Sequence, residues 1–322
     1  MTTLVTGASG FLGSNLIEAL NARGGTPRAL LRATSSRAAL VGLRCEPVIG
    51  DVLEMDTLRS AMRGVKAVLH AAAVVDDDRH DEATLYRVNV DGTRNVLASA
   101  LEAGVERVVV VSSVAALGRP AWDHPADERQ VFNLRPAAFP YGYSKALAEQ
   151  VTRAFVARGL HAVIVNPTVI FGPRDVNHVS ARLLTELARR PLPFYPPGGV
   201  SVVDVGDVCA GVLAALARGE PGRRHVLAGD NLTHRALLGA IADTVGVARP
   251  WLPLPRAVAA LAHPLDGLRR RGLRLPMNGG QLRMSTERWW YDSTRARAAL
   301  GFTTRPALET LARTWAWLRA QP

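Results

Sequence analysis

Residues 1–20, MTTLVTGASGFLGSNLIEAL, decide the fold of this chain. A short apolar run, Leu4 and Val5, precedes three regularly spaced glycines, and from Phe11 onward the apolar residues recur with helical spacing. A strand, a tight turn and a helix in this order are typical of a nucleotide-binding βα unit. The stretch therefore predicts that the chain opens with a binding site for a nucleotide.

The glycines suit this role for separate physical reasons. Gly7 can adopt backbone angles closed to other residues, Gly10 lets a pyrophosphate approach the backbone, and Gly13 lets the helix lie close to its strand. The helix N-terminus then offers unpaired N–H groups and a partial positive charge to the phosphates. The alternative is a glycine turn without a ligand. The residues expected to bind a dinucleotide here are Gly7, Ser9, Gly10, Phe11, Leu12 and Gly13.

Composition argues against several other classes of protein. The 322 residues suffice for one large α/β domain and a smaller one, and 48% of them are hydrophobic. No apolar run reaches the ~18 residues that span a membrane. The sequence starts directly in a predicted strand, so we expect no secretory signal and a cytoplasmic location. Cys45 and Cys209 form neither a disulfide framework nor a metal-ligand pattern, and we expect no metal.

The chain is basic, with a net charge of +11, but its arginines are scattered. They cluster only at Arg269, Arg270, Arg271 and Arg274, and because no nucleic-acid motif accompanies them, we expect no nucleic-acid partner. Residues 256–273 mix Ala and Leu with this cluster. They fit either a solvated amphipathic helix lining the substrate entrance or a helix touching a membrane surface. Lys66 and Lys145 are the two lysines of the chain. Because arginine supplies the positive charge everywhere else, we expect each lysine to be there for a specific reason.

Strands and helices alternate after the first βα unit. Strands are expected at 28–32, 45–49, 67–70, 107–112 and 162–166, and helices at 34–40, 81–103 and 143–157. These apolar, non-alternating strands predict an α/β fold, a doubly wound parallel sheet of Rossmann type, with a smaller C-terminal α+β lobe. Beyond residue 173 prolines cluster and the alternation stops. We therefore expect residues 1–173, with later segments returning to them, to bind the cofactor, and residues 174–322 to form mainly a substrate lobe.

The end of the second strand indicates which nicotinamide cofactor is used. An NAD site usually carries an acidic residue there to bind the ribose hydroxyls. This chain has Arg32 instead, followed by Thr34, Ser35, Ser36 and Arg37. Arginines and hydroxyls would bind a 2′-phosphate by charge-assisted hydrogen bonds, which favours NADP(H) over NAD(H). The alternative is that Arg32 and Arg37 are ordinary surface arginines.

Tyr141 and Lys145 lie four residues apart at the start of a predicted helix, so both point to one face. A phenol has a pKa of about 10, too high for acid–base work near neutrality, and a nearby ammonium would lower it. Tyr143 lies on a different face. Ser113 leaves the predicted strand 107–112 at the carboxyl edge of the sheet, where its hydroxyl can donate to a substrate carbonyl. The alternative for Tyr141 and Lys145 is that they lie on a solvated helix face without a catalytic role.

Taken together, these motifs resemble an extended short-chain dehydrogenase/reductase. The resemblance rests on the glycine turn, Asp51, residues 70–73 (HAAA), residues 89–95 (NVDGTRN), Ser113, Tyr141 and Lys145, in the order of the family. It implies Tyr141 as the acid/base, Lys145 as its activator, Ser113 as the carbonyl hydrogen-bond donor, and a homodimer. It further implies cofactor contacts from Asp51, Val52, Ala71, Ala72, Ala73, Asn89, Tyr141, Lys145, Pro167 and Val169.

The branch of the family is indicated by residues of the sugar-nucleotide enzymes that this chain lacks. Sugar-nucleotide enzymes carry an Asn that reaches the pyrophosphate, and in this chain Val169 stands at the position of that Asn. Those enzymes also carry an Arg and a His in a second motif, and residues 200–205, which correspond to it, contain neither. Arg174 and Arg283 could replace them. The pattern resembles instead the dihydroflavonol reductase, hydroxysteroid dehydrogenase and hopanoid-associated group. We expect an oxidoreductase acting on a ketone or secondary alcohol of an apolar substrate. A sugar-nucleotide epimerase or dehydratase, or a non-catalytic NADP sensor, are the alternatives.

Overall fold

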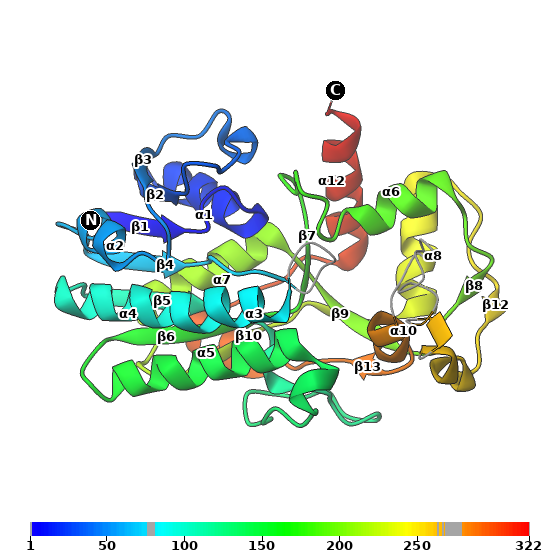
Figure 1. Ribbon diagram of the computed structural model, residues 1–322. Coiled ribbons are helices and arrows are strands. Elements are labelled where there is room, and N and C mark those ends of the chain that lie inside the picture. Colours follow the sequence, from blue (N-terminus) through cyan, green and yellow to red (C-terminus); the bar gives the residue numbers. More distant parts are fainter. Residues whose placement is uncertain (1, 76–80, 263, 266, 268–278, 322) are drawn as a thin grey trace.

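A seven-stranded parallel sheet forms the larger lobe of the computed structural model, which describes residues 2–75, 81–262, 264, 265, 267 and 279–321 (Figure 1). The strand order is β10-β6-β5-β4-β1-β2-β3, so the chain moves outward from β1 in both directions and leaves a switch point between β1 and β4. The strands are β1 (Thr3–Thr6), β2 (Arg28–Leu31), β3 (Glu46–Ile49), β4 (Ala67–His70), β5 (Arg107–Val111), β6 (Ala162–Pro167) and β10 (Arg224–Leu227). The predicted Rossmann-type fold is confirmed.

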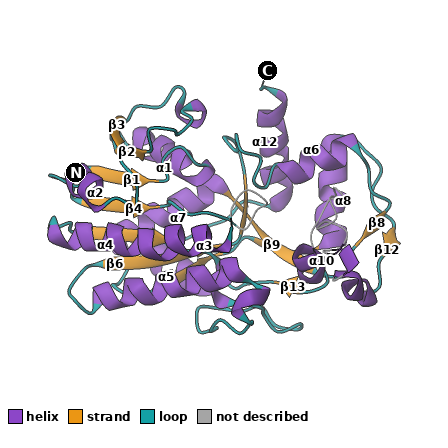
Figure 2. Cartoon of the chain, in the orientation of Figure 1, coloured by secondary structure: helices purple, strands orange, loops and turns teal. Residues whose placement is uncertain are grey.

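Helices cover both faces of this sheet, which is why its central strands are mostly apolar (Figure 2). Val5 and Leu69 pack on one side, against α1 (Phe11–Ala22), α7 (Val205–Arg218) and α11 (Thr294–Leu300). Leu4 and Val68 alternate to the other side, against α2 (Met55–Ala61), α4 (Gly92–Glu102) and α5 (Pro140–Val156). The two buried clusters hold the carboxyl ends of the strands in one fixed row.

The smaller lobe is built around a second sheet. Its strands are β7 (Val169–Phe171), β9 (Gly199–Asp204), β11 (Asp230–Thr233) and β13 (Arg288–Trp289), with β9 paired to the other three. A separate ribbon pairs β8 (Phe194–Tyr195) with β12 (Leu252–Pro253). The lobe's helices are α6 (Arg182–Arg189), α8 (His234–Val245), α10 (Gly279–Ser285), α12 (Ala307–Arg319) and the 3-10 helix η5 (Arg256–Leu261). The chain alternates between the lobes, because α7 and β10 follow β9 and return to the large sheet.

Short elements connect these layers: η1 (Ala38–Leu40), η3 (Val114–Leu117) and η4 (Pro136–Ala138) are 3-10 turns. The predicted helix at 34–40 is wrong, since only η1 is helical there. The Ser35 hydroxyl accepts from the N–H of Arg32, and the Ser36 hydroxyl accepts from the N–H of Ala38. These local hydrogen bonds compete with a regular helix.

Two other helix boundaries also differ from the sequence expectation. The segment expected as one helix at 81–103 divides into α3 (Glu82–Tyr86), a π-helical turn η2 (Arg87–Asp91) and α4. Helix α5 starts at Pro140 rather than 143, because proline is well suited to the first turn of a helix. The arginines at 269–274 lie outside the described residues. None of the described helices has the length and apolar character needed to cross a bilayer.

Candidate active site

The glycine turn packs closely, backbone against backbone, between β1 and the end of β4. Gly7 has a φ of +66°, and a Cβ there would lie 2.7 Å from backbone atoms of Ala71 and Ala72. A Cβ on Gly13 would lie 2.1 Å from the carbonyl oxygen of Gly7. Only glycine fits either position, so helix α1 can lie against the turn.

The N-terminus of α1 is left open to an anion. Gly10 caps the helix without a side-chain hydrogen bond, and the first turn holds no acidic residue. The first N–H groups of a helix lack partners within it and carry partial positive charge. Ser9 and Leu12 remain partly exposed beside them. This backbone fits the pyrophosphate of a dinucleotide.

Arg32 and Arg37 are both exposed at the carboxyl end of β2. Neither forms an ion pair within the part of the chain that the structure describes, although the same part contains many Arg–carboxylate pairs. Ser35 lies between them and orders the turn through the N–H of Arg32, at 3.1 Å. The two guanidinium groups are therefore available to a phosphate.

The neighbouring strand ends lie at the same edge of the sheet as the glycine turn. The Asp51 carboxylate accepts from the N–H of Leu53 at 3.0 Å, while Val52 is buried and its carbonyl accepts from Asn95 at 3.1 Å. Beyond β4, Ala72 donates its N–H to the hydroxyl of Thr6. Asp51, Val52 and residues 71–73 thus follow the carboxyl ends of β3 and β4, as the sequence predicts.

Ser113, Tyr141 and Lys145 come together at the same edge of the sheet. The Ser113 side chain is close enough to Tyr141 to lower the pKa of its phenol, and Ser113 accepts from the N–H of Ala115 at 3.1 Å. Lys145, one turn after Tyr141 on α5, donates from Nζ to the carbonyl of Val111 at 2.9 Å. Tyr143 lies elsewhere, packed at 5.6 Å between ring centroids against Phe132. The loop after β5 and the first turns of α5 therefore bring the three predicted residues together.

Burial sets the protonation behaviour of this group. Desolvation lowers the pKa of Lys145 to about 8, with the nearby charge of Glu149 opposing that shift. Burial raises the pKa of Tyr141, and its interaction with the Ser113 side chain opposes the rise. The sequence argument expects Lys145 to lower the pKa of Tyr141. The net shift is upward instead, because desolvation of the phenol dominates and the ammonium is directed at the Val111 carbonyl.

His70 connects the glycine turn to helix α4 through a chain of hydrogen bonds. Its Nδ1 lies 2.7 Å from the Thr6 hydroxyl and its Nε2 lies 3.0 Å from the Thr93 hydroxyl. Thr93 donates its proton to the carbonyl of Asn89 at 2.6 Å, so it must accept from Nε2. The proton is thus assigned to Nε2, and Nδ1 accepts from Thr6. Burial and the charge of Lys145 lower the pKa of His70 to about 3, which keeps the ring neutral.

Asn89 lies in the π-helical turn and is fully engaged with protein groups. Its amide nitrogen donates to the carbonyl of Val74 at 2.9 Å and to the hydroxyl of Ser144 at 3.0 Å. Its amide oxygen accepts from the N–H of Val74 at 2.8 Å, and Ser144 donates to the carbonyl of Tyr141 at 2.7 Å. Asn89 therefore fixes the loop after β4 against the helix turn that carries Tyr141.

Sequence reasoning missed a buried carboxylate beneath the site. Glu149 is fully buried, and its Oε1 accepts from the Ser112 hydroxyl at 2.7 Å and from Asn166 at 2.6 Å. Its Oε2 lies 3.1 Å from Arg153 Nη2 and 2.7 Å from Arg224 Nε. The signal was the helical spacing of polar residues on α5, since residues 141, 144, 145 and 149 share one face.

This cluster also supports Ser113. Asn166 donates to the Ser113 carbonyl at 2.9 Å as well as to Glu149. A buried carboxylate held by two guanidinium groups and two further donors is expensive to disturb. The backbone of Ser113 is therefore fixed from below by β6.

Strand β7 begins directly after β6. Pro167 is buried at the end of β6, whereas Val169 is 37% exposed. Arg174 is unavailable as a substitute phosphate ligand, because it pairs with Glu18 at 2.9 Å and donates to the carbonyls of Ala39 and Val41.

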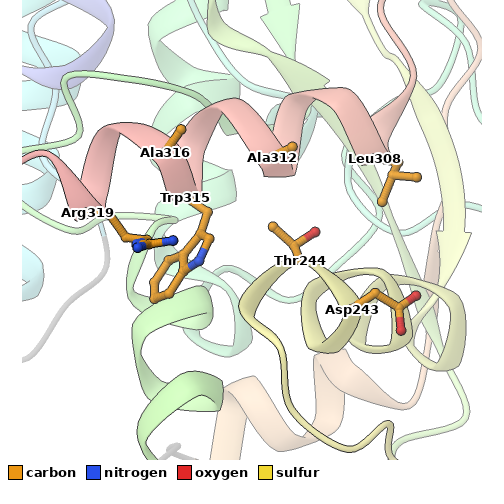
Figure 3. Close-up of a pocket in the computed structure, with 7 residues that line it drawn as sticks. All are labelled: Asp243, Thr244, Leu308, Ala312, Trp315, Ala316 and Arg319. Carbon is orange, nitrogen blue, oxygen red and sulfur yellow. The ribbon is translucent and has the colours of Figure 1, made fainter.

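A cavity of about 340 Å³ lies elsewhere, between α8 and α12 (Figure 3). Its lining residues are Asp243, Thr244, Leu308, Ala312, Trp315, Ala316 and Arg319. None of them belongs to the predicted cofactor or catalytic set, and the Asp243 carboxylate is paired with Arg249 at 2.6 Å. The candidate active site is therefore at the carboxyl edge of the large sheet.

Comparisons with known proteins identify the family of this chain. The model of the NAD dependent epimerase/dehydratase family matches residues 3–229. Sterol demethylase protein B of Methylococcus capsulatus is 35% identical over 326 residues, covering 99% of this chain and 98% of that protein. In Stigmatella aurantiaca, 4-hydroxy-2-methyl-3-oxo-4-farnesyl-3,4-dihydroquinoline-1-oxide ketoreductase is 35% identical over 277 residues, covering 84% and 81%. The crystal structure of dTDP-glucose 4,6-dehydratase from Streptomyces venezuelae, with NAD bound, has a TM-score of 0.79 at 26% identity, covering 99% and 97%.

Proposed function

The chain belongs to the NAD-dependent epimerase/dehydratase family, and on that premise we propose that it interconverts a ketone and a secondary alcohol on a bulky, largely apolar substrate, using NADP(H). It is an NAD(P)-dependent enzyme of the short-chain dehydrogenase/reductase type. The observation that carries the proposal is the placement of Ser113 beside Tyr141, with Lys145 one helical turn behind.

The residues divide the work of carbonyl reduction. The bound cofactor supplies a hydride for the carbonyl carbon. Ser113 donates a hydrogen bond to the carbonyl oxygen, and Tyr141 transfers its proton to the same oxygen, so the product is an alcohol. Lys145 retains two donors beyond its bond to Val111, which suit the nicotinamide ribose hydroxyls and the phenolate left on Tyr141. Oxidation runs these steps in reverse.

An apolar substrate is supported by the loss of phosphate ligands. Val169 replaces the pyrophosphate-binding Asn of the sugar-nucleotide enzymes, and Arg174 is held by Glu18. A buried diphosphate without fixed donors would bind poorly. The names of two relatives, a sterol demethylase protein and a farnesyl-quinolone-oxide ketoreductase, support an apolar ketone.

The alternative is a sugar-nucleotide epimerase or dehydratase, which the likeness to dTDP-glucose 4,6-dehydratase favours. Such an enzyme regenerates its cofactor in each cycle, whereas an oxidoreductase releases oxidised cofactor in proportion to product. The deciding experiment is a screen of NADPH oxidation against β-keto acids, steroids, flavonoids and aldehydes, with NADH in parallel. A redox-neutral conversion of a sugar nucleotide, without net NADPH oxidation, would replace the proposal. A pure NADP sensor has no need of the Ser113–Tyr141–Lys145 set.

The unpaired arginines predict a cofactor preference that mutation can remove. In Arg32→Ala/Arg37→Ala, kcat/KM for NADPH should fall about 10- to 100-fold, the effect of losing charge-assisted hydrogen bonds to the 2′-phosphate. The value for NADH should change less than about threefold, because NADH has no 2′-phosphate. Arg63→Ala, an exposed arginine in another loop, is the control. Equal losses of kcat/KM with both cofactors would show that these arginines do not bind the 2′-phosphate.

The depressed pKa of Lys145 predicts an alkaline limit to activity. Lys145 works as an ammonium, so kcat/KM should fall as the pH rises above about 8, the folded-state pKa of this group. Tyr141 has a raised pKa and stays protonated through this range. Lys145→Arg should move the limit upward by more than about two pH units, since a guanidinium has a pKa above 12. An unchanged limit in that variant would assign the titration to another group.

A further inference from the structure

The outer ribbon of the smaller lobe has an unusual composition. Residues 187–203 and 244–261, which contain β8, β12 and η5, include four arginines and no acidic residue. In Figure 1 the paired strands β8 and β12 lie at the outer edge of the smaller lobe, remote from the seven-stranded sheet. We call the paired strands β8 and β12, together with Leu192, Trp251 and Leu261, the distal ribbon.

The distal ribbon exposes large apolar side chains. Trp251 is 72% exposed and Leu261 is 55% exposed, and Leu192, Phe194 and Leu252 are exposed as well. These five belong to a short set of large apolar side chains exposed anywhere in the described chain. Single exposed apolar residues need no explanation, but a group on two paired strand segments and their flanks marks an interaction surface.

The register of the ribbon shows which way it faces. Phe194 pairs with Leu252 and Tyr195 pairs with Pro253. Tyr195 faces the body of the lobe, since the guanidinium of Arg235 on α8 lies 5.8 Å from its ring centroid. Strand alternation therefore turns Phe194 and Leu252 away from α8 and toward solvent.

The surrounding charge identifies the kind of partner. Arg189 and Arg190 are exposed just before the ribbon and form no ion pair within the described residues. Arg256 stacks on Trp122 at 3.8 Å and lies 3.4 Å from Glu287. Only Arg249 is matched closely, by Asp243. An apolar strip with unneutralised arginines beside it complements a surface that is negative outside and apolar beneath.

We propose that the distal ribbon docks the protein on the surface of a bilayer that contains anionic phospholipids. Trp, Phe and Leu enter the boundary between headgroups and acyl chains, and arginines remain at the phosphates. A second copy of the chain is disfavoured as the occupant, because a two-fold contact would bring the same unneutralised arginines together. Nucleic acid would satisfy the arginines and leave the apolar strip in water. The proposal does not depend on the proposed reaction.

Docking would also bring the smaller lobe to the place where apolar compounds concentrate. Binding is expected to strengthen with anionic lipid and to weaken with salt, because arginines near a charged surface contribute a screened attraction. The apolar contribution should remain at high salt.

The test is flotation of the full-length protein with vesicles of phosphatidylcholine alone or with about 30% phosphatidylglycerol, a composition that gives a negative surface. Wild type should float mainly with the anionic vesicles. Trp251→Ser/Leu252→Ser should weaken that binding about tenfold, and Arg189→Gln/Arg190→Gln about fivefold or more. Val41→Ser, which removes a 73% exposed apolar residue from the other lobe, is the matched control.

Thermal melting and NADPH oxidation check that each variant is folded, and the single variant Trp251→Ala provides a milder change on an exposed side chain. Three outcomes would overturn the proposal. The first is flotation of wild type with neither vesicle. The ribbon variants could bind as wild type does. Light scattering could show a wild-type oligomer that Trp251→Ala dissociates, in which case the ribbon contacts a second copy of the chain.

Discussion

Tyr141→Phe should lower kcat about 10²- to 10⁴-fold, the usual contribution of a positioned general acid. The substitution removes one hydroxyl and keeps the ring that packs 6.4 Å from Phe139. The hydroxyl is the titrating group that interacts with Ser113, so proton transfer to the substrate oxygen is lost while the helix remains intact. The dissociation constant of NADPH should change less than about threefold, because the glycine turn and the arginines are untouched.

Tyr143→Phe is the matched control for this experiment. It lies on the same helix two residues away, and its ring packs against Tyr86 at 6.3 Å and Phe132 at 5.6 Å. Initial rates and fluorescence titration with NADPH measure the two effects. Turnover of Tyr141→Phe at the wild-type rate would remove Tyr141 from catalysis. Loss of cofactor binding together with turnover would indicate a structural role.

Gly13→Ala should remove cofactor binding and destabilise the protein by about 3 kcal/mol or more, at the upper end for an overpacked site. The added Cβ would lie 2.1 Å from the Gly7 carbonyl oxygen and 2.7 Å from its carbonyl carbon. Both atoms are backbone, so no side-chain rotation relieves the clash. Helix α1 must move away from the turn, and its N-terminus then no longer points at the phosphates.

Gly239→Ala provides the opposite result from the same chemical change. Gly239 also lies inside a helix, α8, but the nearest atom to its added Cβ would be 3.9 Å away, in the Arg249 side chain. Alanine there should stabilise the protein by up to about 1 kcal/mol, because it favours the helix. Denaturant unfolding and NADPH titration measure both variants. Equal stability of the two variants would show that the close approach at Gly13 is not required.

The sequence was sufficient where function depends on residues close together in the chain. The glycine spacing and the apolar strands predicted the sheet, and the four-residue spacing predicted that Tyr141 and Lys145 share a helix face. The strand β4 is found at the predicted residues, Ala67–His70. Short periodic patterns of this kind reflect backbone geometry, which local residues determine.

Prediction failed where side chains pair across long sequence distances or where local polar groups compete. Glu149 gains its meaning from Asn166, 17 residues later, and from Arg224 on β10. The tautomer of His70 depends on Thr93, 23 residues away. At 34–40 the serine hydroxyls bind backbone N–H groups, an effect that apolar periodicity does not register. The direction of the Tyr141 pKa shift depended on burial, which spacing alone does not reveal.

The return of the chain to β10 has a consequence for synthesis of the protein on the ribosome. Strand β10 covers the edge of β6 and brings Arg224 to the buried carboxylate of Glu149. Until residue 227 has emerged, the nascent larger lobe has an unpaired strand edge and a carboxylate lacking one of its two guanidinium partners. Its last strand arrives only after β9 of the other lobe has been made. The two lobes are therefore expected to reach their stable form together, as one cooperative unit.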